Sequence, residues 1–493
     1  MTNHNPQFNF DNTYARELEG FYAPWEGEKA PSPKIVVFNK ILAENIGLNE
    51  SSLNTEHGAA ILSGTTVPKG ANPLAQAYAG HQFGGFSPQL GDGRALLLGE
   101  LLDKQGQRFD LQLKGSGRTP FSRGGDGKAV LGPVLREYLM GEAMHALSIP
   151  TTRALAAVTT GEDIVRDGLK PGAVLARIAS SHLRVGTFQF FAARKEWDKV
   201  KQLADYAIAR HYPELVAADD KYQLFLLAVA ERQVQLVAAW LHVGFVHGVM
   251  NTDNMTISGE TIDYGPCAFV DAYDTNTVFS SIDKNGRYAF GNQPVIAQWN
   301  LARLAETLLP LIDPDDGDNA IRLATNVING FMGRYTDVWK SGMGAKIGLV
   351  SAEDGDAALI NDLFTAMDGQ NVDYTQLFRR MADAAAGDDK GLLELFDNAE
   401  KIIKWLVTWQ DRLLRDPQDP VARAQAMNAV NPIYIPRNHN VEAALSAAEH
   451  GNMVLFDKLL EVLSDPFTKR DGLEIFEGPA PDDFGPYQTF CGT

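Results

Sequence analysis

The sequence predicts an α/β (α+β) fold in two parts: a mixed sheet with one main helix over residues 1–178, and a helical region over 179–493. Two observations lead to this prediction. Short strand-like segments, one of which alternates apolar and polar residues, recur in the first part, whereas the second part shows the 3.6-residue periodicity of helices. The chain of 493 residues is long enough for more than one core-forming unit.

The first part is organised around a predicted β-hairpin. Residues 95–100 form a short apolar, strand-like segment, and residues 109–114 alternate apolar with polar side chains. The polar segment Asp103–Gln107 joins them. The second strand ends on Lys114. Residues 1–60 are expected to form an irregular lead-in with short helical pieces, because proline, asparagine and glycine residues interrupt this segment.

A glycine-rich loop over residues 115–132 follows the hairpin, and a helix is predicted over 133–147. Pro133 stands near the start of this helix, where proline is well tolerated. Further strands are predicted at 154–160 and 173–178.

In the second part, Tyr222–Val243 is strongly apolar and is followed by Gly244, which predicts a long helix ended by a glycine cap. Helical periodicity recurs in four later segments: 299–312, 374–386, 391–415 and 441–464.

The composition excludes several classes of protein. A net charge of −18 disfavours non-specific binding to nucleic acid or anionic lipid, so neither is expected as a partner. The sequence contains no uninterrupted apolar stretch of about 18 residues, so no membrane-spanning helix is predicted. The acidic first thirty residues fit neither a secretory signal nor a transit peptide, so the cytoplasm is the expected location. The two cysteines, Cys267 and Cys491, are too few for a disulfide scaffold.

Glycine loops provide the first candidates for a nucleotide site. Gly115-Ser116-Gly117 and Gly127-Lys128 match neither the dinucleotide fingerprint nor the phosphate-binding loop of P-loop proteins. Gly91-Asp92-Gly93-Arg94, followed by Lys114 on the next strand, matches the glycine turn and strand lysine of protein kinases. A tight hairpin with a surface lysine remains the alternative.

Two further features would complete such a site. Residues 108–136 form a basic island in an acidic chain, with six lysines and arginines against Asp110 and Asp126, although a solvated loop would have the same composition. Glu137 lies on the predicted helix after the lysine strand, where a kinase places the glutamate that pairs with its lysine. An ordinary exposed glutamate is equally compatible with the helical periodicity.

The segment from His247 to Asn254, with Asp263-Tyr264-Gly265 after it, resembles the catalytic and metal-binding loops of kinases. On that pattern Asn254 and Asp263 are the metal ligands, but the position of the catalytic aspartate is Val249. Asp253 is the nearby carboxylate that could act as a base. The site is therefore either inert or performs different nucleotide chemistry, and a simple polar turn after a buried helix is the remaining alternative.

Several long motifs resemble the selenoprotein O family of kinase-like protein adenylyltransferases, and the similarity covers nearly the whole chain. The motifs are residues 78–84, 89–94, 112–117, 247–254 and 431–438. The resemblance implies a protein-kinase-like bilobal fold, with lobes over 1–178 and 179–493 and a helical extension of the second lobe. It also implies transfer of AMP from ATP, or of UMP from UTP, to protein hydroxyls, with Mg²⁺ or Mn²⁺ as cofactor.

The same resemblance implies roles for individual residues. Asp253 would be the base, Asn254 and Asp263 the metal ligands, and Glu137 the partner of Lys114. The residues implied to contact the nucleotide are Gly91, Gly93, Arg94, Lys114, Asp126, Gly127, Arg177, Arg184 and Asp263. Arg177 and Arg184 would hold the terminal phosphates, although the sequence alone is equally compatible with strand-end surface arginines.

The resemblance also implies a redox pair between Cys267 and Cys491, and the alternative is a buried Cys267 with a free thiol in the tail. The expected function is thus AMP transfer from ATP to Ser, Thr or Tyr hydroxyls of proteins. A phosphotransferase that uses the γ-phosphate and a non-enzymatic nucleotide-binding scaffold remain open. The sequence does not indicate the oligomeric state or the protein substrates.

Overall fold

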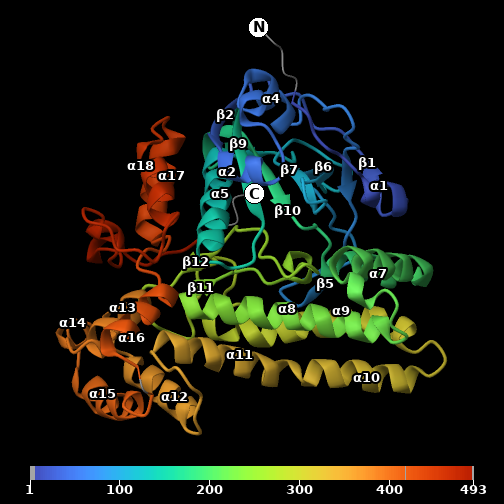
Figure 1. The fold of residues 1–493 in the computed structure, drawn as a ribbon. Coiled ribbons are helices and arrows are strands. Elements are labelled where there is room, and N and C mark those ends of the chain that lie inside the picture. The colour runs from blue at the N-terminus through green and yellow to red at the C-terminus, as the bar shows by residue number, and fades with distance from the viewer. Residues whose placement is uncertain (1–5, 417, 491–493) are drawn as a thin grey trace.

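The computed structural model describes residues 6–416 and 418–490 and places an antiparallel sheet above a layer of long helices (Figure 1). The sheet has the strand order β1-β3-β6-β7-β10-β9-β2, and β8 pairs with β10. This mixed architecture confirms the predicted α/β class and is consistent with a kinase-like fold. The strands are β1 Tyr22–Pro24, β2 Lys34–Phe38, β3 Leu74–Gln76, β6 Ala95–Leu102, β7 Arg108–Lys114, β8 Ala129–Val130, β9 Arg153–Arg166 and β10 Gly168–Ala179.

The predicted hairpin is confirmed, because β6 and β7 pair antiparallel with Ala95 opposite Lys114. The next two strands, β9 and β10, are much longer than predicted. They form one hairpin that turns at Asp167–Gly168, where Gly168 has φ +107°. The polar residues near this turn resemble a loop in the sequence, but they belong to the exposed end of the hairpin, where no core has to be filled.

Strand β2 lies in the segment that was expected to be irregular, and it forms an edge of the main sheet beside β9. Its partner is more than a hundred residues away in the sequence, so no local pattern announces the pairing. Four short helices surround it in the chain: α1 Thr13–Glu17, α2 Lys40–Asn45, α3 Glu50–Leu53 and α4 Glu56–Leu62.

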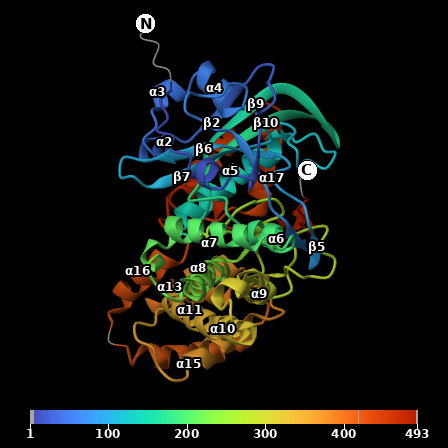
Figure 2. The same cartoon turned by 90° about the vertical axis from the view of Figure 1, so that its right-hand side faces the viewer.

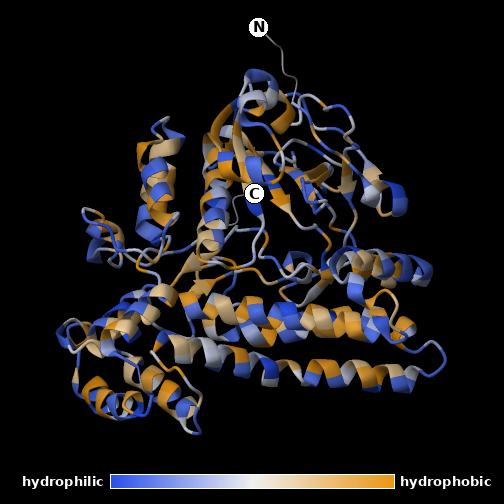
Figure 3. Cartoon of the chain, in the orientation of Figure 1, coloured by the Kyte–Doolittle hydropathy of each residue, from blue (hydrophilic) through white to orange (hydrophobic). Residues whose placement is uncertain are grey.

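Both faces of the sheet are apolar. Successive side chains of a strand point to opposite sides, so the consecutive leucines of β6 supply apolar side chains to both faces. On one face, Leu96, Leu98 and Val174 pack with residues of α2, α3 and α4. On the other face, Leu97 and Leu175 join the main core with helix α5, Leu131–Ala146, which confirms the helix predicted over 133–147. Figure 3 shows this concentration of hydrophobic residues along the strands.

The helical region begins after the sheet and contains the predicted long helix, α8, Lys221–Val243, which ends at Gly244 with φ +77°. The predicted segment 391–415 is two helices, and so is 441–464, where Gly451 with φ +86° ends the first. The helices are α6 Val185–Ala192, α7 Trp197–His211, α9 Gln293–Ile312, α10 Gly317–Asn329, α11 Phe331–Lys346, α12 Asp356–Met367, α13 Tyr374–Ala385, α14 Lys390–Leu393, α15 Glu400–Leu413, α16 Pro420–Val430, α17 Asn438–Glu449 and α18 Val454–Leu463.

Among the described residues, α8 is the one helix long and apolar enough to cross a membrane, and 61% of that apolar window is buried inside the protein. It packs against α9, α10 and α11, as Figure 1 shows. A buried core helix has the same length and composition as a membrane span, so this feature is weak evidence for membrane insertion.

The last two helices return to the first part of the chain. Both α17 and α18 pack against α5, and Figures 1 and 2 place α17 beside that helix. Tyr138 of α5 and Phe456 of α18 meet with ring centroids 6.3 Å apart. The division of the chain at residue 178 stays a prediction.

Candidate active site

A cavity of about 1520 Å³ opens between the sheet with α5 and the loops that follow α8. It is lined by all twelve residues for which the sequence analysis named a nucleotide, metal, base or ion-pair role: Gly91, Gly93, Arg94, Lys114, Asp126, Gly127, Glu137, Arg177, Arg184, Asp253, Asn254 and Asp263. These residues come from segments spread over more than 170 positions of the sequence. The fold therefore gathers them in one place.

Asp263 is the centre of a buried ion-pair cluster. Lys114 Nζ lies 2.7 Å from Asp263 Oδ1 and 2.6 Å from Glu137 Oε2. Arg177 Nη1 lies 2.8 Å from Asp263 Oδ1 and 2.8 Å from Glu137 Oε1. The sequence prediction that Glu137 pairs with Lys114 is thus matched by the geometry.

Strand register explains how β7 and β10 deliver these cations. Arg177 stands opposite Gln112, and Leu175 stands opposite Lys114, so both cations lie on the face covered by α5. Arg177 Nε donates to Gln112 Oε1 at 2.8 Å, which fixes the guanidinium against the neighbouring strand. A single arginine in the otherwise apolar segment 173–178 is the signal that could have singled out Arg177.

Arg184 joins this cluster from the start of α6. Its Nη1 donates to Asp263 Oδ2 at 2.7 Å and to the Asp253 carbonyl oxygen at 2.6 Å. The guanidinium carbon also lies 4.7 Å from the centre of the Tyr78 ring. Arg184 therefore ties the segment that carries Asp263 to the loop that carries the candidate base.

The charges of the cluster decide its protonation. Burial alone would raise the pKa of Asp263, but Lys114, Arg177 and Arg184 hold it well below its usual range. Burial opposes the charged form of Glu137 as well, and Lys114 with Arg177 lowers the pKa of that carboxyl. Three cations share two carboxylates, so the site keeps positive charge for an anion such as a triphosphate.

Asp253 occupies a different environment in the same cavity. Burial raises the pKa of its carboxyl to about 6, and its Oδ2 accepts a hydrogen bond from Gln82 Nε2 at 3.2 Å. Gln82 belongs to a small hairpin of β4, Gly80–Gln82, and β5, Gly85–Ser87, which sequence reasoning did not connect with the base. A carboxyl whose pKa lies close to neutrality suits proton transfer.

Gly80 gives this carboxyl its space. A Cβ at position 80 would lie 2.2 Å from Asp253 Oδ1. We therefore expect Gly80→Ala to displace the Asp253 carboxylate and to lower the rate of the expected AMP transfer at least about tenfold. Gly333→Ala is the control, because a Cβ there meets nothing within 4 Å. Steady-state rates of label transfer and ATP affinity should be measured for both variants. Equal transfer rates in the two would contradict this role for Gly80.

Asn254 and Asp263 fit a divalent cation that arrives with a nucleotide. Asn254 ends a short 3-10 turn, and its Nδ2 donates to the Val249 carbonyl at 3.1 Å, which leaves the amide oxygen as a ligand. Among the described residues, no group of three or more His, Cys, Asp or Glu side chains could hold a metal. Mg²⁺ does not need one, since it usually combines one or two protein oxygens with substrate phosphates and water.

Close packing explains why two of these positions are occupied by glycine. Gly91 has φ +71°, and a Cβ there would lie 2.3 Å from the Phe121 ring. Gly127 has φ +67°, and a Cβ would lie 2.1 Å from the Gly117 carbonyl. The predicted glycine turn and the glycine-rich loop thus pack on each other at the edge of the cavity.

Asp126 is engaged in an ion pair that the sequence did not suggest. Arg166 of β9 holds both of its carboxylate oxygens at 2.9 Å, and this hydrogen bonding lowers the pKa of Asp126. The basic island is also divided: Arg108 pairs with Asp11 and Glu100, outside the residues that line the cavity.

Comparison with known proteins assigns the chain to a family. Residues 5–464 match the family model described as "Protein adenylyltransferase SelO". The chain belongs to the SelO family. A Cereibacter sphaeroides protein named "Protein nucleotidyltransferase YdiU" is 61% identical over 488 residues, which cover 99% of this chain and all of the relative. Relatives of the same name from Rhizobium etli and Rhizobium rhizogenes are 55% and 54% identical, and each match covers 99% of this chain and 97% of the relative.

Membership of this family means that the SelO-family chain is a nucleotidyltransferase, an enzyme that uses a nucleoside triphosphate. The resemblance noted in the sequence is therefore confirmed at the level of the family and the class of enzyme. The roles of individual residues stay predictions.

The redox pair also stays a prediction. Cys267 is buried and forms no disulfide within residues 6–416 and 418–490, and burial raises the pKa of its thiol to about 11. Cys491 lies outside the described residues. The tail before it does reach the site: Thr489 Oγ1 donates to the Pro266 carbonyl at 2.8 Å, and residues 486–490 line the cavity.

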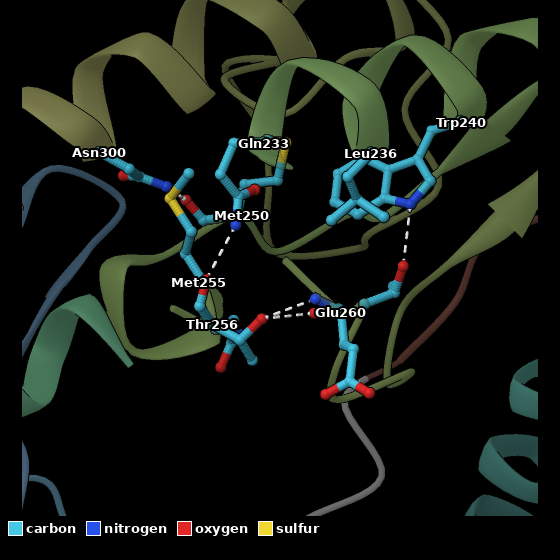
Figure 4. A pocket seen from close by; sticks show the side chains of 10 residues that line it. Gln233, Leu236, Trp240, Met250, Met255, Thr256, Glu260 and Asn300 are labelled. Atoms are coloured by element: carbon cyan, nitrogen blue, oxygen red, sulfur yellow. Dashed lines mark hydrogen bonds between the residues drawn. The ribbon is translucent and has the colours of Figure 1, made fainter. Parts of the chain in front are cut away.

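A second, much smaller cavity lies behind the loop that carries Asp253, between α8 and residues 250–261 (Figure 4). Its volume is about 10 Å³, close to the space that a single water molecule requires. It is therefore too small for a nucleotide. Around it, Trp240 Nε1 donates to Thr261 Oγ1 at 3.0 Å, and Thr256 Oγ1 donates to the Glu260 carbonyl at 2.7 Å.

Proposed function

We propose that this SelO-family chain transfers AMP from ATP to Ser, Thr or Tyr hydroxyls of proteins and releases pyrophosphate. The observation that supports this proposal most is the arrangement of two carboxylates in one cavity. Three cations contact the Asp263 carboxylate, whereas the Asp253 carboxylate forms no ion pair with any described residue. The kinase base position is the buried, apolar Val249.

In the proposed reaction, the acceptor hydroxyl oxygen forms a bond to the α-phosphorus, and the bond from that phosphorus to the α,β-bridging oxygen breaks. Asp253 takes the hydroxyl proton, and the bonding electron pair leaves with pyrophosphate. General bases in this role typically contribute about 10²–10⁴-fold to the rate.

The cations of the cluster orient the triphosphate. Lys114, Arg177 and Arg184 would contact its oxygens, and guanidinium groups suit this task because they present several donors in a fixed plane. Asn254 and Asp263 would hold Mg²⁺ or Mn²⁺, which when bound neutralises charge on the leaving group. Gly91, Gly93, Arg94, Asp126 and Gly127 would border the nucleotide.

ATP labelled on either the α- or the γ-phosphate tests this proposal. The chain would be incubated with each ATP, a divalent metal salt and a mixture of protein acceptors, and protein-bound label would be counted. We expect label from the α-phosphate only. Label from the γ-phosphate only would establish a phosphotransferase, and no label with retained ATP binding would establish a scaffold. α-Labelled UTP in the same assay tests UMP transfer.

A further inference from the structure

The β4–β5 hairpin forms the wall of the cavity beside the candidate base. His81 N donates to Thr252 Oγ1 at 2.7 Å, and Phe83 N donates to Asn251 Oδ1 at 3.1 Å. Gln82 and Phe83 line the cavity, and Gln82 also contacts Asp253. An acceptor chain that brings its hydroxyl to Asp253 along this wall meets the hairpin.

The outer side of the hairpin carries aromatic side chains that remain accessible. The His81 ring contacts Phe86 at 4.9 Å and Trp299 of α9 at 5.3 Å between centroids, and the Phe83 ring lies 5.1 Å from Tyr288. Phe83 is nevertheless 38% exposed and Phe86 42% exposed. Exposed rings next to an active site provide apolar contact area for a partner.

Two arginines extend this surface. Their guanidinium carbons lie close to the centre of the Trp299 ring, Arg287 at 4.8 Å and Arg303 at 4.9 Å. A Cβ on Gly84 would lie 3.6 Å from the Arg287 guanidinium, so this cation rests against the turn of the hairpin.

Few carboxylates neutralise these two cations. Arg303 pairs with Glu306 at 2.7 Å, whereas Arg287 has no carboxylate within ion-pair distance in residues 6–416 and 418–490. The nearby Asp283 accepts the backbone N–H groups of Arg287 and Tyr288 at 2.9 Å and 2.8 Å. The Arg287 guanidinium thus carries a positive charge that no described carboxylate pairs with, in a chain whose net charge is −18.

We propose that Phe83, Phe86, Arg287, Trp299 and Arg303 form an acceptor-docking surface, which binds an acidic protein segment next to the hydroxyl to be modified. Apolar side chains of the segment would contact Phe83 and Phe86, and its carboxylates would bind the guanidinium groups stacked on Trp299. This inference rests on the proposed function, because it places the acceptor at Asp253. It adds the chemical class of the acceptor: a hydroxyl residue flanked by aspartate or glutamate.

A binding experiment tests this surface without requiring catalysis. Two fluorescent peptides would share a leucine and a central serine, with aspartates at the flanking positions of one and asparagines at those of the other. Fluorescence anisotropy would report their affinity for the full chain loaded with α,β-methylene ATP and Mg²⁺. We expect the aspartate peptide to bind about tenfold or more tightly, with a preference that falls as salt rises.

The variant with Arg287→Gln and Arg303→Gln should lose this preference and keep its affinity for the nucleotide. Arg322→Gln is the matched control, because Arg322 is an exposed arginine on α10 that is not part of the proposed surface and should leave the preference intact. Phe86→Ser should weaken both peptides equally. Equal binding of the two peptides to the unmodified chain would overturn the proposal, and so would a preference that survives in the double variant.

Two further outcomes separate this surface from the proposed function and from other partners. α-Label transfer to both peptides, without any difference in binding, would keep the function and reject the docking surface. Selective binding by a chain that also transfers no α-label to the mixture of protein acceptors would reject the function and leave only an anion-binding surface. A single-stranded oligonucleotide of equal length that binds as tightly as the aspartate peptide would show general anion binding and overturn the acceptor assignment.

Discussion

Asp263→Asn is expected to reduce AMP transfer by about 10³-fold or more, because the change removes a proposed metal ligand and the shared partner of three cations. Asparagine keeps the shape of the side chain, so the cavity should retain its form. ATP binding measured without divalent metal should persist, since Lys114, Arg177 and Arg184 lose a competing carboxylate. Initial rates with α-labelled ATP, together with calorimetric ATP affinities, measure both effects.

Loss of a buried ion-pair partner also destabilises a protein, typically by about 3–5 kcal/mol, and this effect has to be separated from catalysis. Asp416→Asn is the matched control, because Asp416 is a buried carboxylate 3.1 Å from Arg412 in the distant helical region. Both variants should unfold at lower urea concentrations, but only Asp263→Asn should lose transfer. Full activity in Asp263→Asn would mean that the metal assignment is wrong.

Asp253→Asn is expected to lower the rate of transfer about 10²–10⁴-fold, with a small change in ATP affinity. The reason is chemical: an amide cannot take the proton of the acceptor hydroxyl, whereas it can still accept the hydrogen bond from Gln82. Single-turnover rates with saturating ATP isolate this step from nucleotide binding.

Asp205→Asn serves as the control for this variant, because Asp205 lies on α7 and pairs with Lys201 and Lys221, outside the residues that line the cavity. Its transfer rate should remain that of the unmodified chain. Val249→Asp adds a second comparison, since it restores the aspartate of the kinase pattern. If that change created γ-phosphate transfer while Asp253→Asn kept α-transfer, the base would have been assigned to the wrong residue.

The sequence predicted those elements of the fold whose patterns are local. The hairpin of β6 and β7 was indicated by two strand-like segments around a polar turn, helix α5 by an apolar helical stripe after Pro133, and helix α8 by a long apolar segment before Gly244. Strand β2 was missed because its pairing with β9 joins residues far apart in the chain, and pairing of this kind leaves no mark on either segment alone.

The same distinction holds for the candidate site. Asn254 and Asp263 lie in motifs short enough to recognise, and Lys114 stands at the end of a predicted strand. Gln82 could not be connected with Asp253 in this way, because the β4–β5 hairpin carrying it meets the catalytic loop only in the folded chain. Residues 486–490 line the same cavity, but no sequence motif or spacing indicates that the tail reaches it.

The sequence by itself therefore determined the class of fold, the family and the set of chemical groups available for phosphate, metal and proton. These properties depend on residue types at short spacings. Only the tertiary structure decided that Asp263 is charged among three cations while Asp253 is buried with a raised pKa. The reason is physical: protonation depends on burial and on charges brought together from distant segments, which the linear order of residues does not fix.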